Sequence, residues 1–280
     1  MLWLLLLQVW ASCLWLGQGE VVKSFANTCN QFFYQNMPPA KGLEPQNPAW
    51  ICQTFKDRPF YATLYDKKGR IPVYSAYIYQ FVTSKRTPQL WMVEPQVSVL
   101  SYSMSPSNME TEKTLREKYS VSEKDISESQ AVYQDYLKLK GLDRGHLNPA
   151  SHHDTQDGRD ATFTLTNIVP QNTALNSGKW NVYEQKTMPK KSKDCQTTYA
   201  IVGAVPGTSS IANGRVNVPS HIWASACCKT KKNTVIAWGA IAENDKDKIR
   251  VLTLGALEEK LAELYKRGPV SLFHKDCPRK

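Results

Sequence analysis

The sequence predicts an α+β fold in which a mostly antiparallel central sheet is flanked by helices. Strand-like segments outnumber helical ones, and strands and helices do not alternate strictly along the chain, as they would in a parallel sheet. The chain has 280 residues, of which 41 % are hydrophobic and 10 % aromatic. It is therefore long enough to bury a substantial core and too apolar to be disordered.

Strands are predicted where β-branched and aromatic residues concentrate or alternate with a period of two. These segments are 71–82, 161–167, 199–204, 221–227 and 234–242. Helices are predicted where apolar residues recur three and four positions apart, or where a polar segment has helical composition. These segments are 112–118, within a polar surface excursion over 104–126, then 176–186 and 255–266.

The first nineteen residues are predicted to be a signal peptide. Residues 2–16 are almost wholly apolar and uncharged, and the small residues Gly17 and Gly19 fit a cleavage site. A retained membrane anchor is the alternative, but the stretch is short for one. After residue 20 no apolar run reaches the roughly 18–20 residues of a membrane-spanning helix, so no span is expected. Residues 20–280 show no repeat or linker, and they are predicted to form a single secreted domain.

The cysteines are interpreted in the light of secretion. Six of the seven follow the predicted signal peptide, and an even number in an oxidising compartment predicts three disulfides among about 15 possible pairings. Adjacent side chains of a strand point to opposite faces, so Cys227 and Cys228 are expected to pair with different, distant cysteines. The other four are Cys29, Cys52, Cys195 and Cys277.

The charge of the chain is strongly positive. It has 35 Lys and Arg against 25 Asp and Glu, a net charge of +10. Such an excess suits nucleic acid, heparin or an anionic membrane surface. Two local clusters stand out, although each alone is most often a solvated turn. They are Lys190, Lys191 and Lys193, and Lys229, Lys231 and Lys232.

Chemically suggestive residues gather between positions 143 and 184. The imidazole of His146 is a side chain that can take a proton from water near neutral pH. In an extended segment Arg144 falls on the same side as His146, where it could grip a phosphate. Asp143 is expected to point away and to brace the strand. Gly145 allows another backbone or a substrate to approach closely.

Asn176 and Glu184 are eight residues apart, which on one helix is about 12 Å along the axis. Both therefore cannot readily ligate one metal ion directly. One amide oxygen, with a carboxylate that holds a water on the ion, suits Mg²⁺ because this cation keeps several waters. No His or Cys spacing typical of zinc is present. The adjacent His152 and His153 are expected to lie in a polar loop rather than to bind metal.

The ordered motif in this window resembles that of the DNA/RNA non-specific endonucleases, the ββα-metal nucleases of the Serratia nuclease and mitochondrial endonuclease G type. Its parts are Asp143-Arg-Gly-His-Leu-Asn-Pro-Ala150, Thr166-Asn-Ile-Val-Pro-Gln171, Leu175-Asn176, Trp180 and Glu184. Weaker resemblance extends over most of the chain after the signal peptide. The signal peptide, cysteines and length most resemble the secreted endonuclease domain-containing 1-like proteins. The resemblance implies a ββα-metal (His-Me finger) core within the α+β fold.

The resemblance also implies roles for the matching residues. His146 would be the general base, and Arg144 would bind the phosphate. Asn176 would be the single protein ligand of Mg²⁺, which Mn²⁺ could replace. Asn167 and Glu184 would orient the site, Glu184 through a water on the ion.

The family's further phosphate-binding arginine has no clear match upstream, and Arg86 is the candidate. The expected function is a secreted, Mg²⁺-dependent endonuclease that cuts DNA or RNA without sequence preference. The first alternative keeps the fold and nucleic-acid binding but not the activity, as in a host-defence protein. The second is an unrelated, disulfide-stabilised extracellular binding protein.

Overall fold

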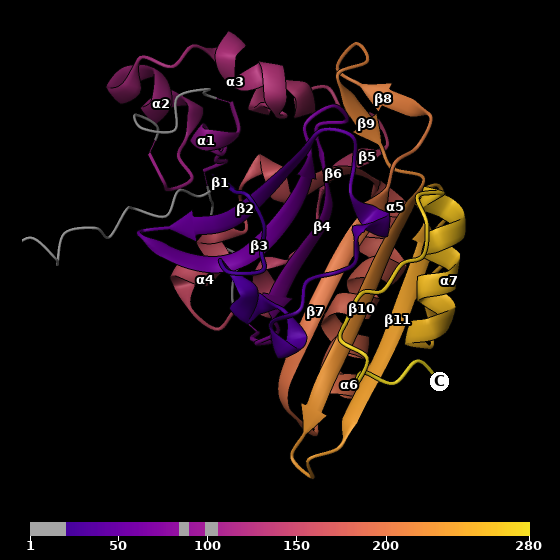
Figure 1. Ribbon diagram of the computed structural model, residues 1–280. Helices are drawn as coiled ribbons and strands as arrows, with labels where there is room; N and C mark the ends of the chain where they lie inside the picture. The colour runs from indigo at the N-terminus through magenta and orange to yellow at the C-terminus, as the bar shows by residue number, and fades with distance from the viewer. Residues whose placement is uncertain (1–20, 84–89, 99–105) are drawn as a thin grey trace, which may run out of the picture.

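The computed structural model describes residues 21–83, 90–98 and 106–280, and within them it shows an eight-stranded sheet in which every neighbouring pair is antiparallel (Figure 1). The predicted α+β fold is therefore confirmed. The predicted signal peptide and Arg86 lie outside these residues. In spatial order the strands are β1 (Val21–Val22), β2 (Pro48–Phe55), β3 (Arg58–Asp66), β4 (Ile71–Ile78), β7 (Cys195–Val205), β10 (His221–Thr230), β11 (Val235–Glu243) and β12 (Arg250–Leu252).

Two hairpin-like pairs stand apart from this sheet: β5 (Leu142–His146) with β6 (Ile168–Asn172), and β8 (Ser209–Ile211) with β9 (Val216–Val218). The α-helices are α1 (Pro95–Ser98), α2 (Glu112–Tyr119), α3 (Glu123–Ser129), α4 (Gln156–Ala161), α5 (Thr173–Leu175), α6 (Met188–Ser192) and α7 (Leu254–Tyr265). In the described part of the chain no helix is both long enough and apolar enough to cross a membrane.

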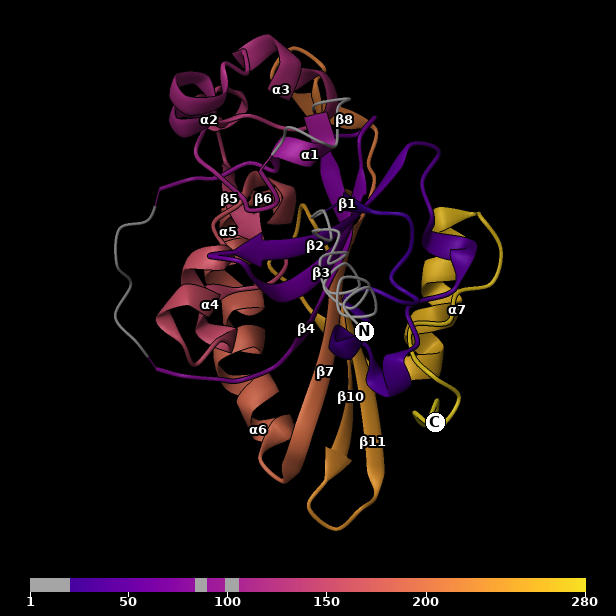
Figure 2. The ribbon, with the colours of Figure 1, turned by 60° about the vertical axis from the view of Figure 1, so that its left-hand side comes forward.

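The central sheet is covered on both faces. Figure 2 shows α7 on one side and the helical run that ends in α6 on the other. Leu257 and Leu261 of α7 pack into one hydrophobic cluster, whereas Trp180 and Met188 of the helical run pack into a second. Because strand side chains alternate between faces, β3, β4, β7, β10 and β11 each supply residues to both clusters.

The predicted strands and helices agree with the structure except in one segment. Strands lie in 71–78, 195–205, 221–230 and 235–243, and helices lie at 112–119 and 254–265 as expected. The strand predicted over 161–167 is wrong: this segment ends α4 and forms a 3₁₀ turn, and the strand is β6, which follows it. Thr164, Leu165 and Thr166 are all fully buried, so the alternation of types does not mark an exposed and a buried face.

The three predicted disulfides are present. They join Cys29 to Cys52, Cys195 to Cys228, and Cys227 to Cys277. Cys227 and Cys228 are consecutive in β10 and pair with different partners, as the alternation of a strand requires. The bridge to Cys195 lies on the face covered by the helical run that ends in α6, and the bridge to Cys277 lies on the face covered by α7.

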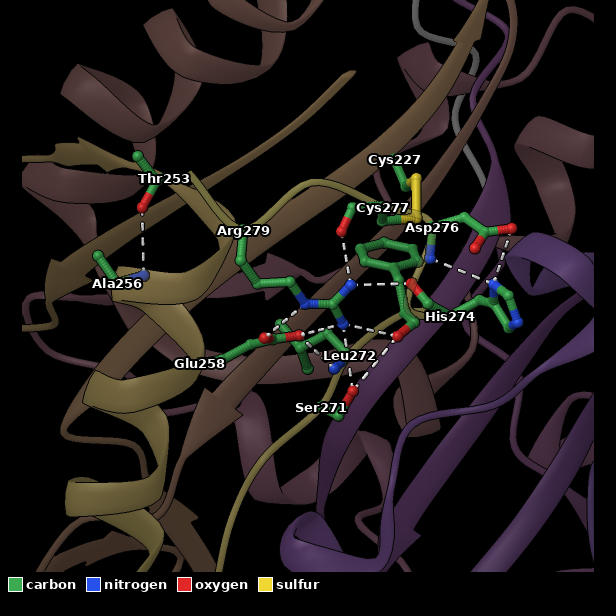
Figure 3. A network of polar contacts seen from close by, with 11 residues as sticks. Cys227, Thr253, Ala256, Glu258, Ser271, Leu272, His274, Asp276, Cys277 and Arg279 are labelled. Carbon is green, nitrogen blue, oxygen red and sulfur yellow. Dashed lines mark hydrogen bonds and ion pairs between the residues drawn. A yellow bond between two sulfur atoms is a disulfide. The ribbon is translucent and has the colours of Figure 1, made fainter. Parts of the chain in front are cut away.

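Arg279 links the C-terminal segment to α7, in addition to the disulfide at Cys277 (Figure 3). The Arg279 guanidinium donates to both carboxylate oxygens of Glu258, at 3.1 Å each, and to the backbone oxygens of Phe273 and His274 at 2.7 and 2.8 Å. Glu258 in turn accepts from the backbone N–H of Leu272 at 2.8 Å. The Glu258 side chain is only 10 % exposed, so this ion pair is shielded from solvent.

We expect Arg279→Ala to lower the free energy of unfolding by about 2 kcal/mol, because it removes the guanidinium that donates to the buried Glu258 carboxylate and to the backbone oxygens of Phe273, His274 and Cys277. Urea denaturation under oxidising conditions measures this loss. Lys275→Ala, at an exposed position of the same segment, is the control and should stay within about 0.5 kcal/mol of the parent protein. Equal losses of unfolding free energy in the two variants would contradict the stabilising role of Arg279.

Candidate active site

The residues with candidate chemistry lie in one unit of two strands and a helix. β5 and β6 pair antiparallel, with His146 opposite Ile168 and Leu142 opposite Asn172. The helix starts at the next residue, because the Asn172 side chain accepts from the backbone N–H of Leu175 at 3.1 Å and caps it. The helix then continues through two π-helical turns, Asn176–Trp180 and Tyr183–Thr187, into α6.

Arg144 and His146 turn to the same side of β5, as expected from their spacing. The Trp91 ring contacts both: its centroid lies 5.7 Å from the imidazole of His146 and 4.7 Å from Cζ of Arg144. Phe163 meets the imidazole edge to face at 4.9 Å. His146 and Arg144 therefore share one aromatic wall, whose geometry limits how either side chain can turn.

The Arg144 guanidinium lies between two aromatic rings, with Tyr133 at 5.3 Å from Cζ and Trp91 at 4.7 Å. Among the described residues it forms no salt bridge, and its buried Nη1 has no hydrogen-bond partner. Stacking holds a guanidinium by its faces and leaves the N–H groups at its edge for an anion. The full charge of Arg144 is thus available to a phosphate.

Asp143 has a different role from the strand brace that the sequence suggested. Its carboxylate accepts from the Asn176 amide at 3.0 Å and from the Thr173 hydroxyl at 2.9 Å. Because Asn176 uses its Nδ2 in this bond, its carbonyl oxygen is directed away from Asp143. Asp143 therefore orients the side chain that the sequence selects as metal ligand.

Asn167 lies fully buried beneath the site. Its oxygen accepts from the backbone N–H of Asn148 at 3.0 Å and from the Ser75 hydroxyl at 2.9 Å, and its nitrogen donates to the backbone oxygens of Asn148 and Thr162. These four bonds fix the main chain two residues after His146. In this structure Asn167 is a positioning residue.

His152 and His153 are buried, so the expectation of a polar loop is wrong. His152 contacts the Tyr77 hydroxyl at 2.9 Å and the backbone oxygen of Glu184 at 3.2 Å, and His153 contacts Asn148 at 2.9 Å. Through its own backbone, Glu184 is thus tied to the sheet, two helical turns beyond Asn176. Burial lowers the pKa of His152 to about 3 and that of His153 to about 4.

A glycine is required at position 145 because the side chain of Gln171 occupies the space of a Cβ. A Cβ at this position would lie 2.2 Å from the amide oxygen of Gln171 and 2.5 Å from its Cβ. Gln171 is fully buried on the strand opposite. Glycine at this position therefore leaves room for the Gln171 side chain, which comes from the paired strand.

The donor set fits a hard cation held by one protein ligand. The Asn176 carbonyl oxygen is not used in the bond to Asp143, and amide oxygens are ligands that Mg²⁺ accepts. Across the described residues, no group of three or more His, Cys, Asp or Glu side chains could enclose a metal ion. A zinc centre of the usual composition is thus not found in that part of the chain.

A β-hairpin that runs directly into a helix is the ββα architecture, and comparisons with known proteins agree with it. The model of the DNA/RNA non-specific endonuclease family matches residues 38–266. Endonuclease domain-containing 1 protein of Homo sapiens is 33 % identical over 215 residues, which are 75 % of this chain and 40 % of that protein. Human mitochondrial endonuclease G is 33 % identical over 106 residues, covering 33 % of this chain and 35 % of that protein.

The solved structure of a complex between EndoG and its inhibitor EndoGI also matches, with a TM-score of 0.50 and 17 % identity over 73 % of this chain and 82 % of that one. This likeness supports the fold. The chain belongs to the DNA/RNA non-specific endonuclease family. It spans about 40 % of the length of the endonuclease domain-containing 1 proteins that it matches, the mouse protein at 31 % identity included.

Sequence reasoning missed the aromatic wall. Trp91 and Tyr133 lie 53 and 11 residues before Arg144, and no local pattern links them to it. The role of Asp143 was missed because strand alternation says which side a residue faces, but not what covers that side. The one signal in the sequence was that Asp143 belongs to the same ordered motif as Arg144, Gly145 and His146.

Acid should destabilise the protein through the buried histidines. Their folded pKa values lie below the usual 6.5, so their contribution is complete above pH 6.5 and is lost as the pH falls toward 4 and 3. Burial raises the pKa of Glu94 to about 8, which opposes this trend, so a difference measurement is needed. His153→Gln should reduce the loss of unfolding free energy between pH 7.5 and pH 5 by about 2 kcal/mol. Urea denaturation of both proteins at the two pH values tests this, and parallel losses would contradict it.

Proposed function

We propose that this chain is a secreted, Mg²⁺-dependent endonuclease that hydrolyses DNA or RNA phosphodiester bonds without sequence preference. The observation that carries the proposal is that one strand, β5, holds all the motif side chains named next in fixed positions. One strand holds Arg144 and His146 against Trp91, and its Asp143 fixes Asn176 at the start of the helix. β5 pairs only with β6 in the described chain, so a phosphate at its free edge can meet side chains from both faces.

In the proposed reaction, His146 takes a proton from the attacking water. The imidazole must be neutral for this step, and it lies against the rings of Trp91 and Phe163. Arg144 binds the phosphate oxygens through the edge of its stacked guanidinium and offsets the charge that develops on them. Asn167 holds the chain after His146 in place throughout.

Asn176 would hold the metal ion, with Glu184 two helical turns further on contacting it through water. Bound there, Mg²⁺ supplies Lewis-acid stabilisation of the leaving oxygen, a role that Mn²⁺ can share. Arg86 is the proposed second phosphate contact. The net charge of +10 supplies sequence-independent attraction for a polyanion.

Secretion is supported by the predicted signal peptide and by the three disulfides, which persist in oxidising compartments. The same bridges make the oxidised protein the form to assay.

His146→Ala should slow cleavage of plasmid DNA and of RNA by about 10²- to 10⁴-fold, the usual contribution of a general base. The parent rate should also fall below about pH 6, where an imidazole protonates. Gel assays with Mg²⁺ and with EDTA measure both. Cleavage that survives EDTA, or a rate that is unchanged at pH 5 with the fold intact by circular dichroism, would oppose the proposal. Binding without cutting would favour the inactive, nucleic-acid-binding alternative.

Asp143→Ala should raise the Mg²⁺ concentration for half-maximal activity by about 10- to 100-fold, as loss of a group that orients a metal ligand does. Saturating Mg²⁺ should restore most of the rate. Asn176→Ala should raise the requirement further and also lower the rate at saturation. The control is Thr173→Val, which removes the other donor to Asp143 and leaves the bond to Asn176. An unchanged metal requirement in Asp143→Ala would refute the positioning role.

A further inference from the structure

The two lysine clusters of the sequence form one surface in the fold. β7 begins at Cys195, which lies opposite Thr230 near the end of β10, and the disulfide from Cys195 to Cys228 joins these strands. The backbone N–H of Lys231 also donates to the backbone oxygen of Asp194 at 2.9 Å. In Figures 1 and 2, α6 and the end of the β10–β11 hairpin come together at the same tip of the molecule. We call this surface the lysine tip: Lys186, Lys190, Lys191, Lys193, Lys229, Lys231 and Lys232.

The lysine tip holds most of the chain's excess charge. Segments 186–194 and 229–232 contain seven lysines and one acid, Asp194, so they contribute +6 of the net +10. Six of the seven lysines are exposed, and within the described chain none of the seven forms a salt bridge. Like charges gathered in this way repel one another, and a polyanion relieves the repulsion.

The tip is also fixed in place. A disulfide joins its two halves, and the ammonium of Lys191 in α6 lies 5.4 Å from the ring centroid of Trp238 in β11. The helix that ends in α6 is the one that begins just before Asn176. From Asn176 to Ser192 its length is about 24 Å, at about 1.5 Å per residue. The tip therefore stands at a set distance from the candidate active site.

We propose that the lysine tip binds backbone phosphates that flank the scissile bond, so that long nucleic acids are held better than short ones. This inference rests on the proposed function. Because phosphates of one duplex strand repeat every 3.4 Å or so, about 24 Å corresponds to about seven base pairs. The helix that leads from Asn176 to the tip favours the substrate itself as the occupant, rather than a sulfated polysaccharide or an anionic membrane.

The test replaces four exposed lysines of the tip by glutamate: Lys190→Glu, Lys193→Glu, Lys231→Glu and Lys232→Glu. The control carries the same change of charge at exposed lysines elsewhere: Lys68→Glu, Lys266→Glu, Lys275→Glu and Lys280→Glu. Each protein is assayed in Mg²⁺ on a 40-base-pair duplex and on a 4-base-pair hairpin. At about 3.4 Å per base pair the short hairpin is about 14 Å long, so it cannot span the interval of about 24 Å from the candidate active site to the tip.

For the tip variant we expect KM on the 40-base-pair duplex to rise at least tenfold beyond the control, with kcat unchanged and with KM on the hairpin equal to that of the control. The slope of log affinity against log salt for the long duplex should become shallower by about 3 to 4, since about 0.9 is lost for each phosphate contact. Equal effects of the tip and control variants, or equal effects on long and short substrates, would overturn the inference. So would loss of binding to heparin or to anionic vesicles with an unchanged KM on the long duplex.

Binding of the 40-base-pair duplex in EDTA separates this inference from the proposed function. If the parent protein binds but never cuts, the proposed function fails, and a tip variant that binds at least tenfold more weakly than the control still supports the inference. If the parent cuts and the tip variant behaves as the control does, the inference alone fails.

Discussion

The candidate site depends on one buried carboxamide. Asn167 accepts from Ser75 of the central sheet and forms bonds in both directions with the backbone of Asn148, two residues beyond His146. A buried amide that lost these partners would cost several hydrogen bonds at once, so the arrangement is closely defined. Through this contact the small β5–β6 hairpin, which shares no ladder with the large sheet, keeps a fixed place on it.

A second buried group fixes the aromatic wall. Glu94 is fully buried and accepts from the hydroxyls of Thr164 and Thr166, and its backbone forms two bonds with the Gln130 side chain. Burial raises the pKa of Glu94 to about 8, so at neutral pH the side chain is largely neutral. Trp91 lies three residues before this anchor, which links the support of Arg144 and His146 to the interior.

Among the residues that the structure describes, acidic side chains pair with the arginines that stabilise the fold, but not with the cations that could bind a phosphate. Buried or half-buried pairs such as Arg215 with Asp135 and Arg279 with Glu258 hold the fold together. Arg144, in contrast, is held by aromatic rings, and the lysine tip has no acidic partner within the described chain. Cations that are positioned without neutralisation keep their attraction for phosphate. Such a distribution suits a protein family that acts on a polyanion.

By itself the sequence determined the features that depend on local pattern: the antiparallel strands, the helix of Leu257 and Leu261, the number of disulfides and the order of the motif residues. Only the tertiary structure decided which cysteines pair, why segment 161–167 is not a strand, and that Asp143 binds Asn176. These outcomes depend on contacts between segments that are distant along the chain or that face one another across an element. Periodicity shows which side a residue takes, whereas packing decides what it meets there.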